Sequence, residues 1–157
     1  MSGNMPTHSE TRQMPYSAQQ MYDLIADVGK YHEFLPWCAA TRIKKEWEQN
    51  AHKVIEAELV ISFKVFRERF TSCVTMKPED GRIDVEYIDG PFKYLYNHWK
   101  FTPNDEGACQ VDFHVDFEFK SAILQGLIGI LFNEAMRQIV GAFEKRAKEL
   151  YGNTANA

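Results

Sequence analysis

Hydrophobic and polar residues alternate along three runs in the middle of the chain, at residues 55–61, 83–87 and 111–119. Alternation of this kind is typical of β-strands that bury one face and expose the other. Short turn-forming segments separate the runs, for example Asp80-Gly81 and Asp89-Gly90-Pro91, and turns of this length favour hairpins. The pattern therefore predicts an antiparallel sheet of consecutive strands, in which residues 111–119 form the clearest strand.

A long helix is expected after the sheet, because residues 121–151 contain no proline and have a helical composition. A helix of about 31 residues, at ~1.5 Å per residue, would be about 46 Å long. Its second half has one apolar face, whereas its first half is apolar on nearly every side. Gly126 and Gly129 in that first half lower helix stability relative to alanine, which indicates a packing reason for them.

The N-terminal part of the chain predicts one edge strand and one amphipathic helix. Residues 7–14 are polar enough for a short edge strand. Ser17 and Gln20 have the spacing of a capping box, and the apolar face that follows ends near Gly29. The order of strand, helix, antiparallel sheet and long helix is typical of α+β architecture with the sheet curved around the final helix. We expect a single domain over residues 7–151, with flexible termini at 1–6 and 152–157.

Charge and cysteine content exclude several classes of function. The chain has 18 Lys and Arg against 22 Asp and Glu, and the net charge of −4 has the wrong sign for a protein that grips DNA over its whole surface. The three cysteines form no Cys-x-x-Cys pair, so neither a disulfide framework nor a metal site is expected. No targeting segment and no run of about 18 apolar residues is visible, and we expect a cytoplasmic protein.

The sequence lacks the common catalytic motifs, including the nucleophile elbow, the zinc-protease motif and the nucleotide-binding loops. His98 and His114 lie on the polar faces of their strands and are interpreted as solvated surface residues. Glu68 shares a strand face with Phe66 and Phe70, so we expect its side chain to point inward. A buried carboxylate needs a partner. A functional carboxyl with a raised pKa and an ion pair with an arginine would both meet that need, and we favour the ion pair.

Aromatic residues make up 13% of the chain, and most of those in the expected strands lie on the inward faces. A well-packed core is the simpler interpretation of residue type alone. A curved sheet that closes on a helix containing Gly126 and Gly129 would instead leave space where side chains are missing. Such a concave, aromatic-lined space suits an apolar ligand, and we expect an internal hydrophobic cavity.

Three segments together resemble the coenzyme Q-binding START-like proteins of bacteria and mitochondria. They are Phe-Leu-Pro-Trp-Cys at residues 34–38, Gly-Pro-Phe at 90–92 before a strand that ends in Asn-His-Trp-Lys-Phe at 97–101, and the strand 113–119 that leads into the long helix. The resemblance spans roughly residues 7–150. It implies a helix-grip fold, in which an antiparallel sheet wraps around the C-terminal helix and a lipid cavity lies between them.

The resemblance also implies a ligand and a role. The ligand would be the polyprenylated quinone coenzyme Q or a precursor, delivered or chaperoned for respiration by a protein that is not an enzyme and has no cofactor. The same superfamily includes polyketide cyclases and aromatases, for which Glu68, Tyr87 and Ser72 are the acid–base candidates here. A close bacterial branch is described as a ribosome association toxin that blocks subunit joining, which would need a basic patch such as Arg42, Lys44 and Lys45.

Transferred onto this sequence, the resemblance predicts ligand contacts at two rims and along two walls. One rim would contain Phe34, Leu35, Pro36 and Trp37, and the other would contain Pro91 and Phe92 after Gly90. The walls would contain Leu59, Phe63, Phe66, Phe70, Tyr87, Leu95, Trp99, Phe113, Val115, Phe117, Leu124, Leu127, Ile128 and Leu131.

The sequence does not identify which positions of the long helix face inward, because the first half of the helix is apolar all round. The surplus apolar surface around residues 123–132 therefore has three interpretations. One is transient contact with the inner (cytoplasmic) membrane surface while the quinone is loaded or released. The others are burial in a dimer and burial beneath a covering loop.

Overall fold

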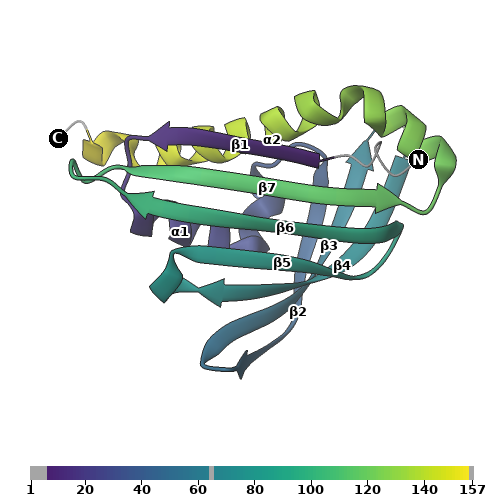
Figure 1. Cartoon of the computed structure of the whole chain (residues 1–157), viewed down its shortest axis with the longest axis horizontal. Coiled ribbons are helices and arrows are strands. Elements are labelled where there is room, and N and C mark those ends of the chain that lie inside the picture. The colour runs from purple at the N-terminus through teal and green to yellow at the C-terminus, as the bar shows by residue number, and fades with distance from the viewer. Residues whose placement is uncertain (1–6, 64–65, 156–157) are drawn as a thin grey trace.

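The computed structural model describes residues 7–63 and 66–155, without the side chains at 63, 66, 128, 130 and 153–155. The element order is β1 (Thr7–Met14), α1 (Ala18–Ala26), η2 (Val28–Glu33), β2 (Cys38–Gln49), β3 (His52–Phe63), β4 (Phe66–Lys77), η3 (Pro78–Asp80), β5 (Arg82–Asp89), β6 (Phe92–Pro103), β7 (Cys109–Phe119) and α2 (Ala122–Ala155). The expected α+β helix-grip architecture is confirmed, because a curved antiparallel sheet lies against one long C-terminal helix (Figure 1).

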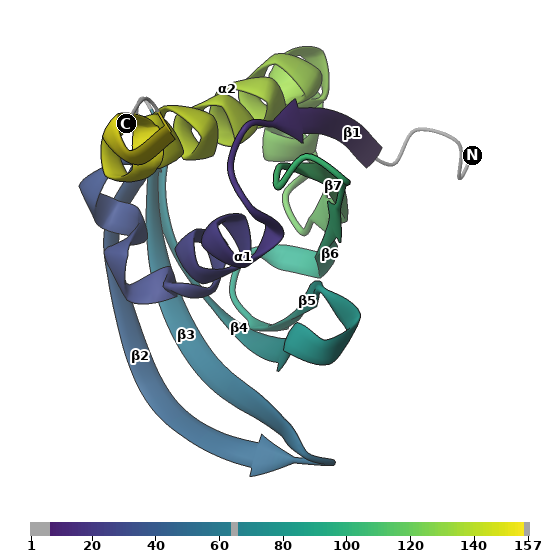
Figure 2. The ribbon, with the colours of Figure 1, turned by 90° about the vertical axis from the view of Figure 1, so that its left-hand side faces the viewer.

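The seven strands form one antiparallel sheet in the order β1-β7-β6-β5-β4-β3-β2. Strands β2 to β7 follow each other as hairpins, as the alternation and the turns predict. The polar segment at residues 7–14 is an edge strand paired with β7. Register shifts occur in β2, β4 and β6, and irregularities of this kind bend a strand. Figure 2 shows the resulting curvature, with α2 across the open side of the sheet and α1 inside the bend.

The helix α1 begins with the predicted capping box. The Ser17 hydroxyl accepts a hydrogen bond from the Gln20 backbone N–H at 3.0 Å, and the Gln20 side chain accepts one from the Ser17 N–H at 2.9 Å. The expected end near Gly29 is wrong, because the α-helix ends at Ala26 and the chain continues as the 3-10 helix η2. In this tighter path the Tyr31 hydroxyl donates to the Ile25 carbonyl, which is one of the acceptors left open at the helix end.

Side-chain contacts along its length hold α2 to the rest of the fold. On β1, Arg12 donates to Glu144 at 2.6 Å, and His8 Nδ1 lies 3.0 Å from Asn133 Oδ1. Near the C-terminal end, the Tyr151 hydroxyl donates to the Gln20 carbonyl at 3.3 Å. The helix continues to Ala155, beyond residue 151, where the domain was expected to end. Residues 1–6, 156 and 157 lie outside the described part of the chain.

Gly126 and Gly129, near the start of α2, have no packing contact at the position of a Cβ atom among the described residues. A Cβ atom placed on Gly126 or Gly129 would meet no heavy atom of the described residues within 4 Å, and both glycines are exposed. The prediction that they face the sheet and open the cavity is therefore wrong. The space below the helix has another cause, because α2 contacts α1, β1 and β7 and spans the concave face of the other strands.

Candidate functional site

A hydrophobic cavity of about 260 Å³ lies between the concave face of the sheet and α2. Its wall combines η2, the segment before β2, strands β2 to β7 and α2. The lining residues are Val28, Tyr31, Leu35, Pro36, Trp37, Cys38, Leu59, Ile61, Phe70, Ser72, Val74, Ile83, Val85, Phe92, Leu95, Asn97, Trp99, Phe113, Val115, Phe117, Phe119, Leu124, Leu127, Ala135, Met136, Ile139 and Phe143.

Strand pairing places the inward side chains in rows that cross the sheet. One row runs through Val74, Val85, Asn97 and Val115 on β4, β5, β6 and β7, which are partners in the antiparallel register. The row beside it contains Ile83, Trp99 and Phe113. The wall is apolar because every second residue of each strand faces inward, and nearly all of these residues are aliphatic or aromatic.

The helix α2 contributes both the inner end of the wall and part of its rim. Phe143 is buried and its ring centroid lies 5.2 Å from that of Trp99, so the helix and the sheet touch there. Toward the start of the helix, Leu127 lines the cavity and is 46% exposed, and Ile123, about one turn earlier, is 83% exposed. This increase in exposure along the helix places the rim of the cavity at the turn that contains Leu124 and Leu127.

A second part of the rim comes from the segment that connects η2 to β2, where Leu35, Pro36 and Trp37 line the cavity. Trp37 has a backbone φ of +65°, a left-handed conformation that is an outlier for a bulky residue. The conformation is held by neighbouring backbone, since the Ser62 N–H donates to the Trp37 carbonyl at 2.8 Å. The strained residue therefore sits at the rim of the cavity.

Arg146 of α2 ties this segment to the helix. Its guanidinium lies 5.2 Å from the ring centroid of Phe34, and Nη2 donates to Glu33 at 2.8 Å. Phe34 itself packs against Phe143 with ring centroids 5.3 Å apart, and it is not one of the lining residues. Phe34 was expected to contact the ligand, but in the structure it supports the rim from behind.

The other rim segment depends on a glycine in the turn between β5 and β6. Gly90 has a φ of +142°, and a Cβ atom there would lie 2.6 Å from the Cβ of Phe70. This close approach brings Phe92 into the wall, where its ring centroid lies 5.4 Å from that of Phe70. Pro91 is half-buried beside Phe92 and is not one of the lining residues, so its contact with a ligand stays a prediction.

Few polar side chains line the cavity, and most have partners or are weak acids. The Tyr31 hydroxyl donates to a backbone carbonyl, and burial raises its pKa above the usual range. Burial also raises the pKa of the Cys38 thiol to about 11, which keeps it protonated near neutral pH. Ser72 and Asn97 are the lining residues with an aliphatic hydroxyl and an amide side chain. Among the lining residues in the described part of the chain there is no carboxylate, histidine, lysine or arginine.

The structure brings most of the predicted side chains together around the cavity. These are Leu35, Pro36, Trp37, Leu59, Phe70, Phe92, Leu95, Trp99, Phe113, Val115, Phe117, Leu124 and Leu127. Leu131 is 37% exposed and is not one of the lining residues. The predicted side chains at Phe63, Phe66 and Ile128 lie outside the described residues. Contact with a ligand stays a prediction for all of these residues.

Two acid–base candidates lie away from the cavity surface. The Tyr87 hydroxyl accepts a hydrogen bond from the Phe92 N–H at 3.1 Å, so Tyr87 supports Phe92 and does not line the cavity. Glu68 is half-buried on β4 and is also not a lining residue. Glu68 is therefore not the buried carboxylate that was expected: it lies near the start of β4, on the strand face that carries Phe70 and Ser72, at a position that does not line the cavity. Of the three candidates, Ser72 alone lines the cavity.

Other lining residues extend the predicted pattern. Ile61, Val74, Ile83 and Val85 lie on the same alternating faces as predicted residues, so continuing the alternation along each strand identifies them. In α2, Met136, Ile139 and Phe143 come from the amphipathic second half and follow helical spacing. Asn97 lies between Leu95 and Trp99 on the same alternating face, but its polar side chain does not match the hydrophobic pattern by which inward residues are recognised.

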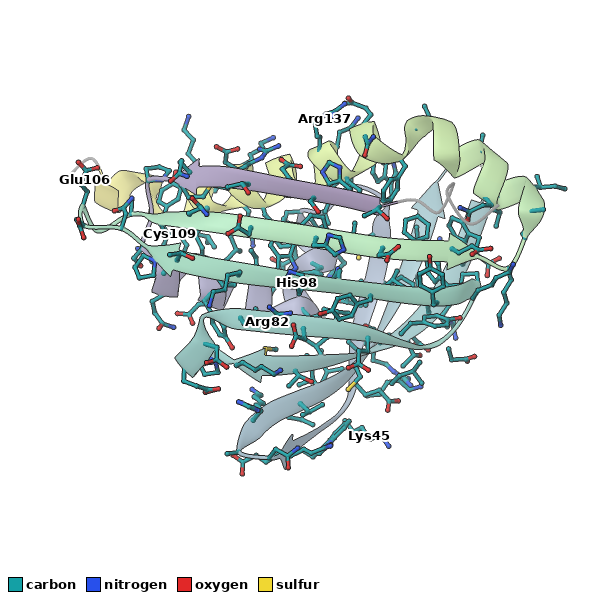
Figure 3. The ribbon with its side chains drawn as sticks, viewed as in Figure 1. Lys45, Arg82, His98, Glu106, Cys109 and Arg137 are labelled. Carbon is teal, nitrogen blue, oxygen red and sulfur yellow. The ribbon has the colours of Figure 1, made fainter. Side chains whose placement is uncertain are left out.

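The outer face of the sheet holds the histidines and the basic residues that the sequence singled out. His98 points outward from β6 (Figure 3) and stacks on His114 with ring centroids 5.4 Å apart. Burial, followed by the charge of Arg82, lowers the pKa of His98. Within the described ranges, no group of three or more His, Cys, Asp or Glu side chains could hold a metal ion. Lys44 and Lys45 on β2 lie 3.6 and 3.8 Å from the carboxylate of Glu56, which partly neutralises that basic patch.

None of the helices in the described part of the chain has the length and apolar character needed to cross a membrane.

Comparison with known proteins gives a consistent set of similarities. Residues 14–144 match the family described as polyketide cyclase / dehydrase and lipid transport. The ribosome association toxin RatA of Escherichia coli strain K12 is 38% identical over 149 residues, which cover 94% of this chain and 90% of that protein. The mitochondrial coenzyme Q-binding protein COQ10 homolog B of Xenopus laevis is 36% identical over 152 residues, 92% of this chain and 59% of that protein.

The fold is also shared with solved structures. A START superfamily protein from Mycobacterium smegmatis superposes with a TM-score of 0.77, covers 92% of this chain and 98% of its own, and has 17% identity. Identity at this level supports the fold alone.

Proposed function

The chain belongs to the polyketide cyclase / dehydrase and lipid transport family, and we propose that it binds a polyprenylated quinone, coenzyme Q or a precursor, and carries or chaperones it. The apolar cavity between the sheet and α2 is the observation that carries this proposal. Burial of a prenyl tail in such a space is favourable by about 0.8 kcal/mol per CH2 group. The similarity to a coenzyme Q-binding protein supports the choice of a quinone among apolar ligands.

The volume of the cavity indicates how much of the ligand it encloses. At about 260 Å³ it lies just below the ~300 Å³ at the lower end of common ligand pockets. A quinone ring with the first part of its tail is compatible with that space, whereas a long polyprenyl tail is not. The remainder of the tail would leave past Leu124 and Leu127 at the rim.

The composition of the wall supports a carrier over an enzyme of the cyclase type. General acid–base catalysis needs a titratable group within hydrogen-bond reach of the substrate. Glu68 and Tyr87 stand away from the cavity surface, and the pKa values of Tyr31 and Cys38 are raised by burial. Delivery of the quinone for respiratory electron transport is the role that fits a binding protein without turnover.

The function can be tested by titrating delipidated protein with a short-tailed ubiquinone while tryptophan fluorescence is recorded. Trp37 and Trp99 line the cavity, so a bound quinone ring would quench their emission. We expect saturable quenching that a prenyl hydrocarbon competes away. Linear quenching without saturation, equal to that of free tryptophan, would contradict the proposal.

Association with the ribosome is the second candidate, favoured by the similarity to ribosome association toxins over 90% of their length. The exposed Arg42 with Lys44 and Lys45 is the surface such contact would use, although Glu56 faces both lysines. Sedimentation with ribosomal subunits over a range of salt concentrations tests this candidate, because contacts with phosphates weaken as salt rises. No salt-sensitive co-sedimentation would exclude it.

The exposed apolar residues at the rim support transient contact with a membrane surface as the route of loading. Ile123 and Leu127 lie on consecutive turns beside the cavity opening. Replacement of Ile123 by lysine should reduce co-flotation with quinone-containing vesicles about tenfold, since burial of a large aliphatic side chain is worth about 1.5–3 kcal/mol.

Ile43→Lys on β2 is the matched control for this experiment, because Ile43 is also exposed and lies on another element. It should float like the wild type. An equal loss of co-flotation in both variants would contradict membrane loading at this turn. A wild-type protein that does not float with the vesicles and sediments as a dimer would contradict it as well.

A further inference from the structure

One polar side chain interrupts the apolar lining of the sheet. Asn97 lies opposite Val85 on one side and Val115 on the other, and with Val74 these residues form one row across four strands. Its neighbour His98 points to the outer face of β6 (Figure 3), so Asn97 faces the cavity, as its place among the lining residues requires. The row would be uniformly valine without it.

The Asn97 side chain has an unused hydrogen-bonding atom. Its Oδ1 is buried and has no hydrogen-bond partner among the described residues. A buried polar atom without a partner costs free energy, and most such atoms in folded proteins are paired. Nothing in the strand geometry demands an amide at this position, because valines occupy the equivalent positions on both neighbouring strands.

The other polar groups of the wall are less suited to hold a ligand. The Tyr31 hydroxyl donates to the Ile25 carbonyl, and the Cys38 thiol donates to the Ala40 carbonyl at 3.8 Å. The hydroxyl and thiol protons are therefore donated to backbone carbonyls and are not available to a ligand. Ser72 also lines the cavity, but it lies on β4 outside the row that contains Asn97. Its hydroxyl is therefore the group with which Asn97 is compared.

We propose that the Asn97 amide binds an oxygen atom on the ring of the ligand, so that the ring lies against the centre of the sheet and the tail points to the rim. This inference rests on the proposed binding of a prenylated ring. An asparagine amide offers both a donor and an acceptor. Nδ2 can donate to a quinone carbonyl, and Oδ1 can accept from a quinol hydroxyl, so one side chain serves both redox states of the ring.

The test compares two probes on the wild type and on Asn97→Val. The first probe is a short-tailed ubiquinone, and the second is a hydrocarbon with the same prenyl tail and no oxygen. Asn97→Val should bind the quinone about tenfold more weakly, a difference of about 1.4 kcal/mol, and should bind the hydrocarbon as the wild type does. Its melting temperature should be unchanged or higher, because valine removes the unpaired atom and completes the row.

Two further variants make the outcome specific. Tyr96→Val changes the adjacent exposed position of β6 and should leave the affinity for both probes unchanged. Ser72→Ala should reduce quinone affinity less than Asn97→Val does.

Several results would overturn the assignment of Asn97. Wild-type affinity for the quinone in Asn97→Val would show that the amide does not hold the ring, while lipid binding itself would stand. Equal loss of both probes with a lower melting temperature would show a structural role. A wild-type protein that binds neither probe would contradict the proposed function and this inference with it.

Discussion

Replacing Trp99 with alanine is expected to lower the free energy of unfolding by about 3–5 kcal/mol, as for other large-to-small changes of buried aromatic residues. Trp99 is only 4% exposed, and its ring centroid lies 4.4 Å from that of Phe113 and 5.2 Å from that of Phe143. The contact between Trp99 and Phe143 joins the sheet to α2, so its loss weakens the packing of the sheet against the helix. The cavity would also grow by the volume of the lost ring.

Thermal and urea unfolding measure this effect. For a chain of this size about 1 kcal/mol corresponds to roughly 2–4 °C, so the melting temperature should fall by about 10 °C. Trp47→Ala is the control, because Trp47 is half-buried on β2 and not part of the buried core cluster, and it should cost less than about 1 kcal/mol. If Trp99→Ala lowers the free energy of unfolding by less than about 1 kcal/mol, Trp99 forms part of the cavity wall without contributing to the packed core.

Replacing Val85 with tryptophan is expected to abolish quinone binding while the fold survives. Val85 faces inward from the middle of β5 and is only half-buried, because its side chain borders the hollow. A larger ring there would occupy space that the ligand needs. Affinity should fall at least about a hundredfold, equivalent to about 2.7 kcal/mol or the burial of roughly three CH2 groups.

Fluorescence titration and thermal melting together test this prediction. Because the added ring enters a hollow, the usual overpacking cost of about 1–3 kcal/mol should be small or absent. Ile88→Trp places the same ring on the exposed outer face of β5 and should bind the quinone normally. Normal binding by Val85→Trp would mean that the quinone does not enter this cavity.

The strands of the sheet and their inward faces were predictable, because alternation is a local property of the sequence. The strand predicted at residues 111–119 is part of β7 (Cys109–Phe119) and ends at the same residue. Its odd-numbered residues are all buried, as the alternation requires. The cavity wall on the sheet follows from the same alternation. The hairpin order of β2 to β7 follows from the short turns.

The helix side was less predictable, because a segment that is apolar all round has no distinguishable face. Leu124 and Leu127 line the cavity, whereas Leu131 is exposed and Gly126 and Gly129 meet no neighbour. Which of these positions faces inward depends on where α2 rests on α1, β1 and β7, a tertiary contact with no local signal.

Single residues near the ends of elements were the hardest to place. Glu68 lies near the start of β4 at a position that does not line the cavity, and Phe34 was assigned to the rim although it packs behind it. Asn97 was unrecognised for the opposite reason, since a polar residue on an inward face contradicts the hydrophobic pattern. Such a contradiction between pattern and position is where a functional residue is expected.

Native mass spectrometry of the protein purified from its own source tests most directly whether it binds a quinone. We expect a bound species with the mass of a prenylated quinone in the wild type and its absence in Val85→Trp purified in the same way. Wild-type protein that carries no prenyl lipid in repeated preparations, and that shows no saturable binding of added quinone, would contradict quinone binding as the function.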